Sequence, residues 1–249
     1  MGMLSVACVL LVQPALVTVE VGNLPLVISA PHGGTEAVPN VPPRKGNGVR
    51  QFTTVRDTNT DLLARALADR VYAETGKRPH LVVAHFSRKY IDANRAAKDA
   101  YESKAASETY DLFHDGLREA SRQAKTLGQA WLVDIHGQGA SSDTVYLGTQ
   151  NRSTLHDGRV AWKTDGIFGR LQHAGLKILP AADGVAEDRR FNGGYIVQTY
   201  GATAGASGLN AVQLEFGSNF RSTPAQRTET ARKLWDALRP LVLPPSSRR

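Results

Sequence analysis

Two histidines and a glutamate occur at the ends of short apolar runs in this chain. His32 follows the run LVISA, His136 ends the run AWLVDIH, and Glu215 lies in LNAVQLEF. Two histidines and a carboxylate form a zinc site that leaves one coordination position open. Zinc at such a site lowers the pKa of a bound water, and a separate glutamate can pass the proton of that water to a leaving amine. The three positions together indicate metal-dependent hydrolysis.

Each of these residues also has a simpler explanation. His32 can be a turn residue before two glycines, His136 a hydrogen-bonded core residue, and Glu215 an ion-pair partner. The coincidence of all three at apolar-run ends favours a common site. In that case Gly33 and Gly34 are expected to let the backbone approach the metal and the substrate closely.

A cluster of basic and amide side chains follows another apolar run, HLVVAHF. The next residues, SRKYIDANR, include Arg88, Asn94 and Arg95. A guanidinium group stabilises an oxyanion or holds a carboxylate, because its planar fork matches the geometry of these groups. The cluster therefore predicts an anionic substrate.

Composition narrows the choice of ligands and partners. Cys8 is the only cysteine, so a thiolate zinc site is excluded and any metal must be held by His, Asp or Glu. The formal net charge is +7, but the basic residues are scattered and form no long basic helix. This charge favours anionic substrates or simply serves solubility, and the scatter of the basic residues disfavours nucleic acid as a partner.

The segments that must position these residues alternate between strand and helix patterns. Five short apolar runs predict strands and four amphipathic patterns predict helices, and the alternation is typical of a three-layer α/β fold. We expect a mostly parallel (mixed) sheet with helices on both faces, with ligands bound beyond the carboxyl ends of the strands. The loop 40–52 is expected over that edge. The predicted strands are 24–30, 80–86, 130–136, 176–181 and 209–216, and the predicted helices 57–76, 107–128, 158–175 and 223–241.

The two ends of the chain stand apart from this pattern. Residues 1–16 form an apolar stretch of signal-peptide length without a basic beginning, so it is either an export signal, which we slightly favour over a cytoplasmic location, or a buried strand. It is too short to predict a stable membrane span. We expect one domain over 17–243, with TVEVG as a first strand, and a disordered tail at 244–249. Oligomeric state is not predicted.

Six motifs together resemble the N-formylglutamate amidohydrolase family. They run in order over most of the chain: APHGG, RDTNTD, SRKYIDANR, VDIHG, RRFNGGYIVQTYG and NAVQLEFG. The block RFNGGYIVQTYG with AVQLE is the most specific of them. The resemblance implies a fold similar to the zinc carboxypeptidases and aspartoacylases, and a zinc-dependent amidohydrolase activity.

The resemblance also implies roles for single residues. His32 and His136 match the metal-binding histidines, and Glu215 matches a general base. Asn94 and Arg95 match a pair that binds a substrate carboxylate. The further expectations are a transition-state role for Arg88, substrate contacts from Arg190 and Tyr195, and a weaker candidate in His114.

Two acidic residues compete for the place of third metal ligand. Glu36 lies in the same loop as His32, four residues later, and ligands from one loop are easily preorganised. Asp57 begins a D-x-x-x-D pattern that also resembles the family, although it can simply cap its helix. The sequence slightly favours Glu36 and leaves Asp57 as the alternative.

One departure from the family pattern bears on the substrate. Val197, Gln198 and Thr199 stand where the family has Thr-Arg-His. A neutral amide in place of an arginine weakens carboxylate recognition. The chain is therefore predicted more firmly to be a zinc amidohydrolase than to act on N-formylglutamate.

Three functions remain open on the sequence. The first is hydrolysis of an N-formyl or N-acyl amino acid with metal-activated water. The second is a zinc peptidase or a hydrolase of cell-wall or γ-linked peptides. The third is a non-catalytic module that binds an anionic ligand on the same scaffold, which the presence of His32, His136 and Glu215 disfavours.

Overall fold

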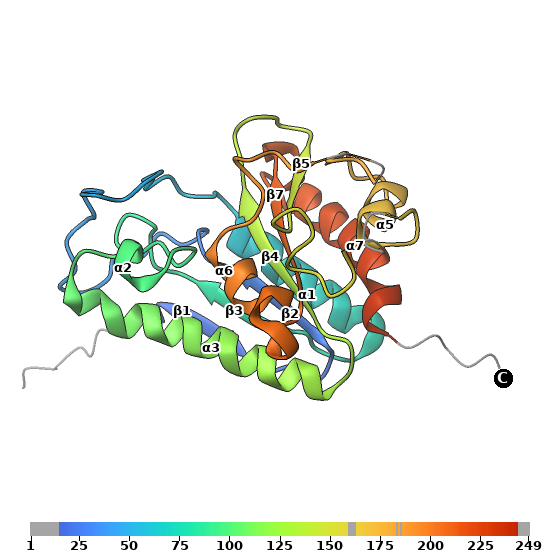
Figure 1. Cartoon of the computed structure of the whole chain (residues 1–249), viewed down its shortest axis with the longest axis horizontal. Helices are drawn as coiled ribbons and strands as arrows, with labels where there is room; N and C mark the ends of the chain where they lie inside the picture. Colours follow the sequence, from blue (N-terminus) through green and yellow to red (C-terminus); the bar gives the residue numbers. More distant parts are fainter. Residues whose placement is uncertain (1–14, 159–162, 183, 185, 244–249) are drawn as a thin grey trace, which may run out of the picture.

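The computed structural model describes residues 15–158, 163–182, 184 and 186–243. The predictions of an N-terminal export segment and of a C-terminal tail fall almost wholly outside these residues and stay predictions. Within them, seven strands form one sheet in the order β1-β3-β2-β4-β7-β5-β6 (Figure 1). The strands are β1 (Val17–Glu20), β2 (Leu26–Ala30), β3 (His80–Ala84), β4 (Trp131–Gly137), β5 (Val145–Gly148), β6 (Ile178–Leu179) and β7 (Asn210–Phe216).

The sheet is parallel at its centre and antiparallel toward both edges. Strands β3, β2, β4 and β7 run parallel to one another. β1 pairs antiparallel with β3, and β5 pairs antiparallel with β7. The predicted mixed sheet is thus confirmed, and the carboxyl ends of β2, β4 and β7 meet at one edge.

Helices cover both faces of the sheet, because successive strand residues point to opposite sides. Ile28 and Val133 pack on one side with α1, α5 and α7, while Val27 and Leu132 pack on the other with α3 and α6. The helices are α1 (Thr60–Thr75), α2 (Ala97–Ala100), α3 (Ser107–Thr126), α5 (Ile167–His173), α6 (Tyr195–Tyr200) and α7 (Pro224–Val242), with 3₁₀ turns η1 (Lys104–Ala106), η2 (Ala202–Ser207) and η3 (Ser218–Phe220).

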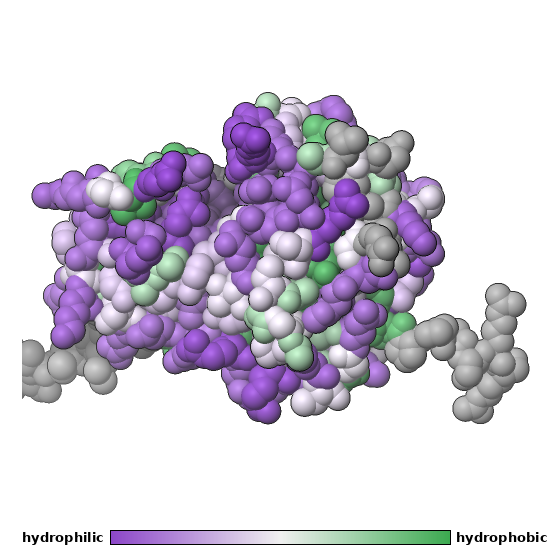
Figure 2. All heavy atoms as spheres, in the orientation of Figure 1, coloured by the Kyte–Doolittle hydropathy of each residue, from purple (hydrophilic) through white to green (hydrophobic). Residues whose placement is uncertain are grey.

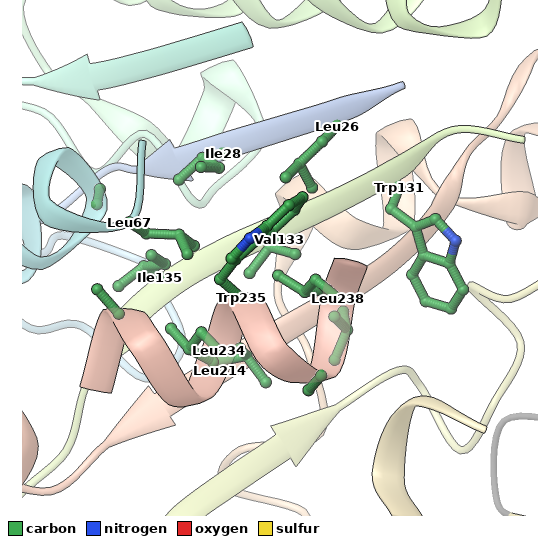
Figure 3. Close-up of a cluster of buried hydrophobic side chains, with 14 of the residues drawn as sticks. Leu26, Ile28, Leu67, Trp131, Val133, Ile135, Leu214, Leu234, Trp235 and Leu238 are labelled. Atoms are coloured by element: carbon green, nitrogen blue, oxygen red, sulfur yellow. The ribbon is translucent and has the colours of Figure 1, made fainter. Parts of the chain in front are cut away.

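The core beneath α1 and α7 is densely apolar (Figure 3). Trp235 of α7 is fully buried there and shares the cluster with Leu26 and Val133 of the sheet and Leu67 of α1. Removing a buried side chain of this size costs about 3–5 kcal/mol of stability. This packing holds the central strands firmly and so fixes the edge where they end.

Local signals place the helix ends, with one exception. Thr223, directly before Pro224, is the N-cap of α7 and forms a reciprocal capping box with Gln226. Gly76 ends α1 at a φ of 65°, a conformation that favours glycine. The exception is α3, whose first residue is Ser107: the turn η1 precedes it, and Ala106 stands at the N-cap without a side-chain cap bond.

The surface in Figure 2 is mainly hydrophilic, with hydrophobic residues in small patches. Among the described residues, the longest helices are too polar to cross a membrane.

Candidate metal centre and active-site cavity

Three segments bring His32, Asp57 and His136 to one point. His32 follows β2, His136 lies in β4 beside it, and Asp57 lies in the loop before α1. Oδ2 of Asp57 is 3.3 Å from Nδ1 of His32 and 3.3 Å from Nδ1 of His136. All three residues are buried, and together they can offer one ligand atom each to a metal ion. Burial opposes the ionisation of Asp57, but hydrogen bonds from His136 and His32 hold its pKa below the usual value.

The other nitrogen of each histidine is bound by a second carboxylate. Nε2 of His32 is 2.7 Å from Asp92, and Nε2 of His136 is 2.8 Å from Asp134. Asp134 in turn accepts a hydrogen bond from Ser29 at 2.6 Å. In the neutral imidazole, Nε2–H donates to this carboxylate and Nδ1 carries the lone pair, so a metal would take the place of the Nδ1 proton that Asp57 accepts here.

The spacing of these donors fits a tetrahedral ion. With metal–nitrogen distances near 2.0–2.1 Å, two ligands of a tetrahedral zinc lie about 3.3 Å apart. The two separations from Asp57 to the histidine Nδ1 atoms have this length. Two nitrogens and one oxygen are also a donor set that suits zinc. The group is therefore compatible with a metal ion held by His32, Asp57 and His136.

The structure does not place Glu36 in this group. Its backbone forms an isolated parallel β-bridge with Phe86. Its side chain is half-buried, and the carboxylate accepts a hydrogen bond from the hydroxyl of Thr35. The alternative that Asp57 caps α1 is also wrong, because the N-cap is Asn59 and has no side-chain cap bond. The preference for Glu36 thus gives way to Asp57, whose loop folds back over the sheet edge.

The glycines after His32 serve packing within the fold. A Cβ at Gly33 would lie 2.5 Å from the backbone nitrogen of Asp61 in α1, and one at Gly34 would lie 2.2 Å from His85. The expectation that they let the backbone approach metal and substrate closely stays a prediction. They let the loop pass between α1 and the segment after β3.

Glu215 lies beside the metal group on β7. It is paired in register with His136 of β4 and is only 9% exposed. Burial raises the pKa of Glu215 to about 7, against the lowering effect of the His136 charge. A carboxyl group with such a pKa can both accept and release a proton near neutral pH.

Gln213 is a site residue that sequence reasoning missed. Its Nε2 donates to Oε1 of Glu215 at 2.9 Å. Its Oε1 accepts hydrogen bonds from Asn94 at 3.1 Å and from the backbone of Gly194 at 2.8 Å. The two donors fix the orientation of the amide, so its NH₂ group must face Glu215. The alternation of residues along a strand is the signal that puts Gln213 on the face of Glu215.

A cavity of about 440 Å³ lies beside this group. Four arginines are among the residues that line it. Gln51 of the predicted loop 40–52 also lines it, as expected for a loop over this edge, and so does the neighbouring Thr53. A larger cavity of about 750 Å³ between α3 and η2 lacks the metal group and Glu215, so the smaller one is the better candidate for an active site. The charged or amide-bearing residues that line the smaller cavity include Asp57, Arg88, Asn94, Arg95, Arg189, Arg190, Gln213 and Glu215.

The predicted substrate residues fall into two groups. Arg88, Asn94, Arg95 and Arg190 all line the cavity. The amide of Asn94 is nevertheless engaged internally, with Gln213 and with the backbone nitrogen of Ile196 in α6 at 2.8 Å. Tyr195 is absent from the lining among the described residues and packs edge-on against His114.

His114 lies behind the cavity wall. Nδ1 is 2.9 Å from the hydroxyl of Tyr200, and Nε2 is 3.0 Å from the carbonyl of Ala93. Burial lowers its pKa to about 4, so the ring is neutral at neutral pH. The histidine joins α3 and α6 to the loop that carries Asn94 and Arg95.

Gln198, part of the departure from the family pattern, lies outside the cavity lining formed by the described residues. It is exposed, and its amide is 3.4 Å from the carbonyl of Gly193.

The sequence matches the N-formylglutamate amidohydrolase family over residues 24–110 and 100–220. The chain belongs to this family. It is accordingly a hydrolase that acts on carbon–nitrogen bonds of the amide type. A comparison with curated proteins finds no match.

Solved structures support the fold. The N-formylglutamate amidohydrolase from Ralstonia eutropha JMP134 is 19% identical, with 91% of this chain and 97% of that chain covered at a TM-score of 0.63. A gene product of Agrobacterium tumefaciens is 17% identical, with 89% and 91% covered at a TM-score of 0.61. A metallo-carboxypeptidase from Pseudomonas aeruginosa is 12% identical, with 86% and 55% covered at 0.42.

Proposed function

We propose that this amidohydrolase is zinc-dependent and cleaves the amide bond of a small carboxylate-bearing substrate, such as an N-formyl or N-acyl amino acid. The observation that carries the proposal is the convergence of His32, Asp57 and His136 beside Glu215. A basic cavity of about 440 Å³ favours a small molecule over a long peptide. Family membership argues against the non-catalytic alternative.

His32, Asp57 and His136 would hold the ion through two Nδ1 atoms and one carboxylate oxygen. When bound, zinc acidifies a water and polarises the substrate carbonyl. Asp92 and Asp134 keep both imidazoles in the tautomer that binds metal, by accepting the Nε2 protons.

Glu215 accepts the proton of the attacking water and delivers it to the leaving amine. Gln213 holds this carboxylate in place through its amide donor. Arg88 lies 2.9 Å from Asp92 and 3.8 Å from Asp57, which fixes its guanidinium at the cavity wall, where it can stabilise a developing oxyanion.

Arg95 is the proposed group for the substrate carboxylate. It lines the cavity on the loop between β3 and α2, and one of its nitrogens donates to the carbonyl of Asn94 at 3.2 Å. Among the described residues its guanidinium has no carboxylate within ion-pair distance. Its charge is therefore available to a ligand.

The test is metal analysis together with hydrolysis of a panel of N-formyl and N-acyl amino acids. We expect about one zinc per chain and turnover that a chelator abolishes. Glu215→Gln should keep the zinc but lower kcat by about 10²–10⁴-fold, the range typical of a lost general base. A Glu215→Gln variant with full turnover would remove Glu215 from the mechanism, and a wild type that takes up no zinc would remove the metal.

A further inference from the structure

Arg44 carries a buried positive charge beside the catalytic cavity. Only 6% of the residue is exposed, and no other arginine or lysine among the described residues is buried. It lies in the segment between β2 and α1, which also supplies Gln51 and Thr53 to the cavity lining. Burying a charge is costly unless hydrogen bonds or a counterion compensate for it. The partners of this guanidinium therefore indicate what it does.

These partners are mainly backbone carbonyl groups. Nε and a terminal nitrogen of Arg44 both donate to the carbonyl of Arg88, at 3.3 Å and 2.7 Å. The same terminal nitrogen donates to the carbonyl of Thr53 at 2.9 Å. Among the described residues, the one carboxylate within ion-pair distance is Asp92 at 4.0 Å, and it is bound more closely by Arg88 and His32. The guanidinium thus joins two stretches of backbone that border the cavity.

The main chain of Arg44 binds the same stretch as its side chain. The nitrogen of Arg44 donates to the carbonyl of Lys89 at 2.8 Å. One residue thus holds two consecutive carbonyls, those of Arg88 and Lys89. The guanidinium carbon lies over the ring of Phe52, 5.0 Å from its centroid, so the ring helps to cover the charge. The peptide that follows Arg88 is therefore fixed from one side by a single buried residue.

Arg88 is the cavity residue that depends on this contact. Its guanidinium lines the cavity and binds Asp92 through Nε at 3.0 Å and through a terminal nitrogen at 2.9 Å. Those bonds fix the far end of the side chain, while Arg44 fixes the backbone from which it extends. Arg44 itself is absent from the lining formed by the described residues. It can therefore act on a ligand only through the residues that it holds.

We propose that Arg44 is a positioning residue that holds Arg88 at the cavity wall. The inference rests on the proposed function, in which Arg88 stabilises a developing oxyanion. Such a donor acts only at the correct distance from the reacting oxygen, and a displacement of about 1 Å can lower the rate about a hundredfold. A lysine at position 44 would keep the charge but lack the planar fork that binds both carbonyls in fixed directions.

The first test follows the Nε–H group of Arg88 by ¹⁵N NMR and needs no substrate. Its signal is identified as the one that Arg88→Ala removes. Arg44→Met takes away the hydrogen bonds that hold the Arg88 carbonyl, so we expect the Nε–H proton to exchange with water at least about tenfold faster, as for the loss of about one hydrogen bond. An unchanged exchange rate would overturn the proposal.

Arg65→Met is the matched control for this measurement. Arg65 lies in α1, pairs with Glu20, and is absent from the cavity lining formed by the described residues. Its replacement removes an equal charge and should leave the Arg88 signal as it is in the wild type. Circular dichroism confirms that each variant is folded. If Arg44→Met does not fold, Arg44→Lys takes its place in both tests, with a smaller expected effect in the same direction.

The second test is a double-mutant cycle with a substrate from the N-formyl and N-acyl panel. Arg44→Met should lower kcat by about 10–100-fold and change KM by less than about twofold, because an oxyanion contact forms only in the transition state. In an Arg88→Ala background the same substitution should change kcat by less than about twofold. A purely structural role would lower kcat in both backgrounds, and that result would overturn the proposal.

The two tests separate this inference from the proposed function. If Arg88→Ala keeps full turnover while Arg44→Met still accelerates exchange of the Nε–H proton, the oxyanion role of Arg88 is wrong. The hold of Arg44 on Arg88 is confirmed in that case, because the exchange measurement does not depend on hydrolysis.

Discussion

Asp57 and Glu36 offer a matched pair of substitutions for the third metal ligand. Asp57→Asn removes the negative charge that lies 3.3 Å from both histidine Nδ1 atoms, whereas Glu36→Gln makes the same chemical change outside the group. We expect zinc affinity to fall by at least about a hundredfold in Asp57→Asn, because even residues that only support a ligand commonly contribute 10–100-fold. Glu36→Gln should bind zinc as the wild type does.

Metal content after dialysis against a chelator series measures both variants. Circular dichroism confirms that each remains folded. If Glu36→Gln lost zinc while Asp57→Asn kept it, the ion would be held on the other side of the His32 loop and the assigned triad would be wrong.

At the scale of residues, the sequence predicts which residues can take part in the site better than it predicts which residues they contact. His32, His136 and Glu215 could be proposed because each ends an apolar run, and parallel strands bring such residues to one edge. Asp57 could not be preferred, because its place in the group comes from the close approach of its loop to His32, whose carbonyl accepts the backbone nitrogen of Asp57 at 3.1 Å. That approach is a property of the folded loop and has no periodic signal.

The contact between α3 and α6 gives a prediction at the scale of elements. The pKa of His114 is about 4 in the folded protein and near 6.5 in the unfolded chain. Between these values the unfolded state binds the proton and the folded state does not, so acidification favours unfolding. At pH 5 the contribution of His114 to the free energy of unfolding should be about 2 kcal/mol smaller than at pH 7.5.

Urea unfolding at the two pH values measures this difference. Carboxylates also titrate in this range, so His114→Gln serves as the reference, since it lacks only this titrating ring. The variant should show a smaller loss of stability on acidification than the wild type. An NMR titration of His114 near pH 6.5 in the folded wild type would contradict the prediction.

Elements with a strong period were predicted, and those that depend on tertiary contacts were not. α1, α3 and α7 have long amphipathic patterns, and each is found where expected. β5 has four residues and pairs antiparallel with β7. α6 has six residues and begins where Asn94 accepts the nitrogen of Ile196. Both short elements adjoin segments that line the cavity, so the prediction lacked part of the cavity wall.

At the scale of the whole molecule, strand order is what the sequence could not provide. Apolar runs indicate a sheet, but the order β1-β3-β2-β4-β7-β5-β6 depends on pairings between segments far apart in the chain. The antiparallel positions of β1 and β5 are of this kind. The central parallel strands alone bring His32, His136 and Glu215 together, which is why the site could be anticipated without the full topology.

Metal removal should destabilise the entire fold. The three proposed ligands come from the end of β2, the loop before α1 and the end of β4, so an unfolded chain cannot present them together. An ion that binds only the folded state stabilises it by RT ln(1 + [L]/Kd), about 4 kcal/mol when free metal exceeds Kd a thousandfold. Chelation should therefore lower the free energy of unfolding by about that amount.

Chemical unfolding with and without chelator, on wild type and Asp57→Asn, measures this coupling. The chelator should shift the wild type alone, because the variant has little metal to lose. Equal stability of wild type with and without bound zinc would mean that the unfolded chain binds the ion as tightly as the folded one. That outcome conflicts with a site assembled from the end of β2, the loop before α1 and the end of β4, since the sheet and the core beneath it join those segments.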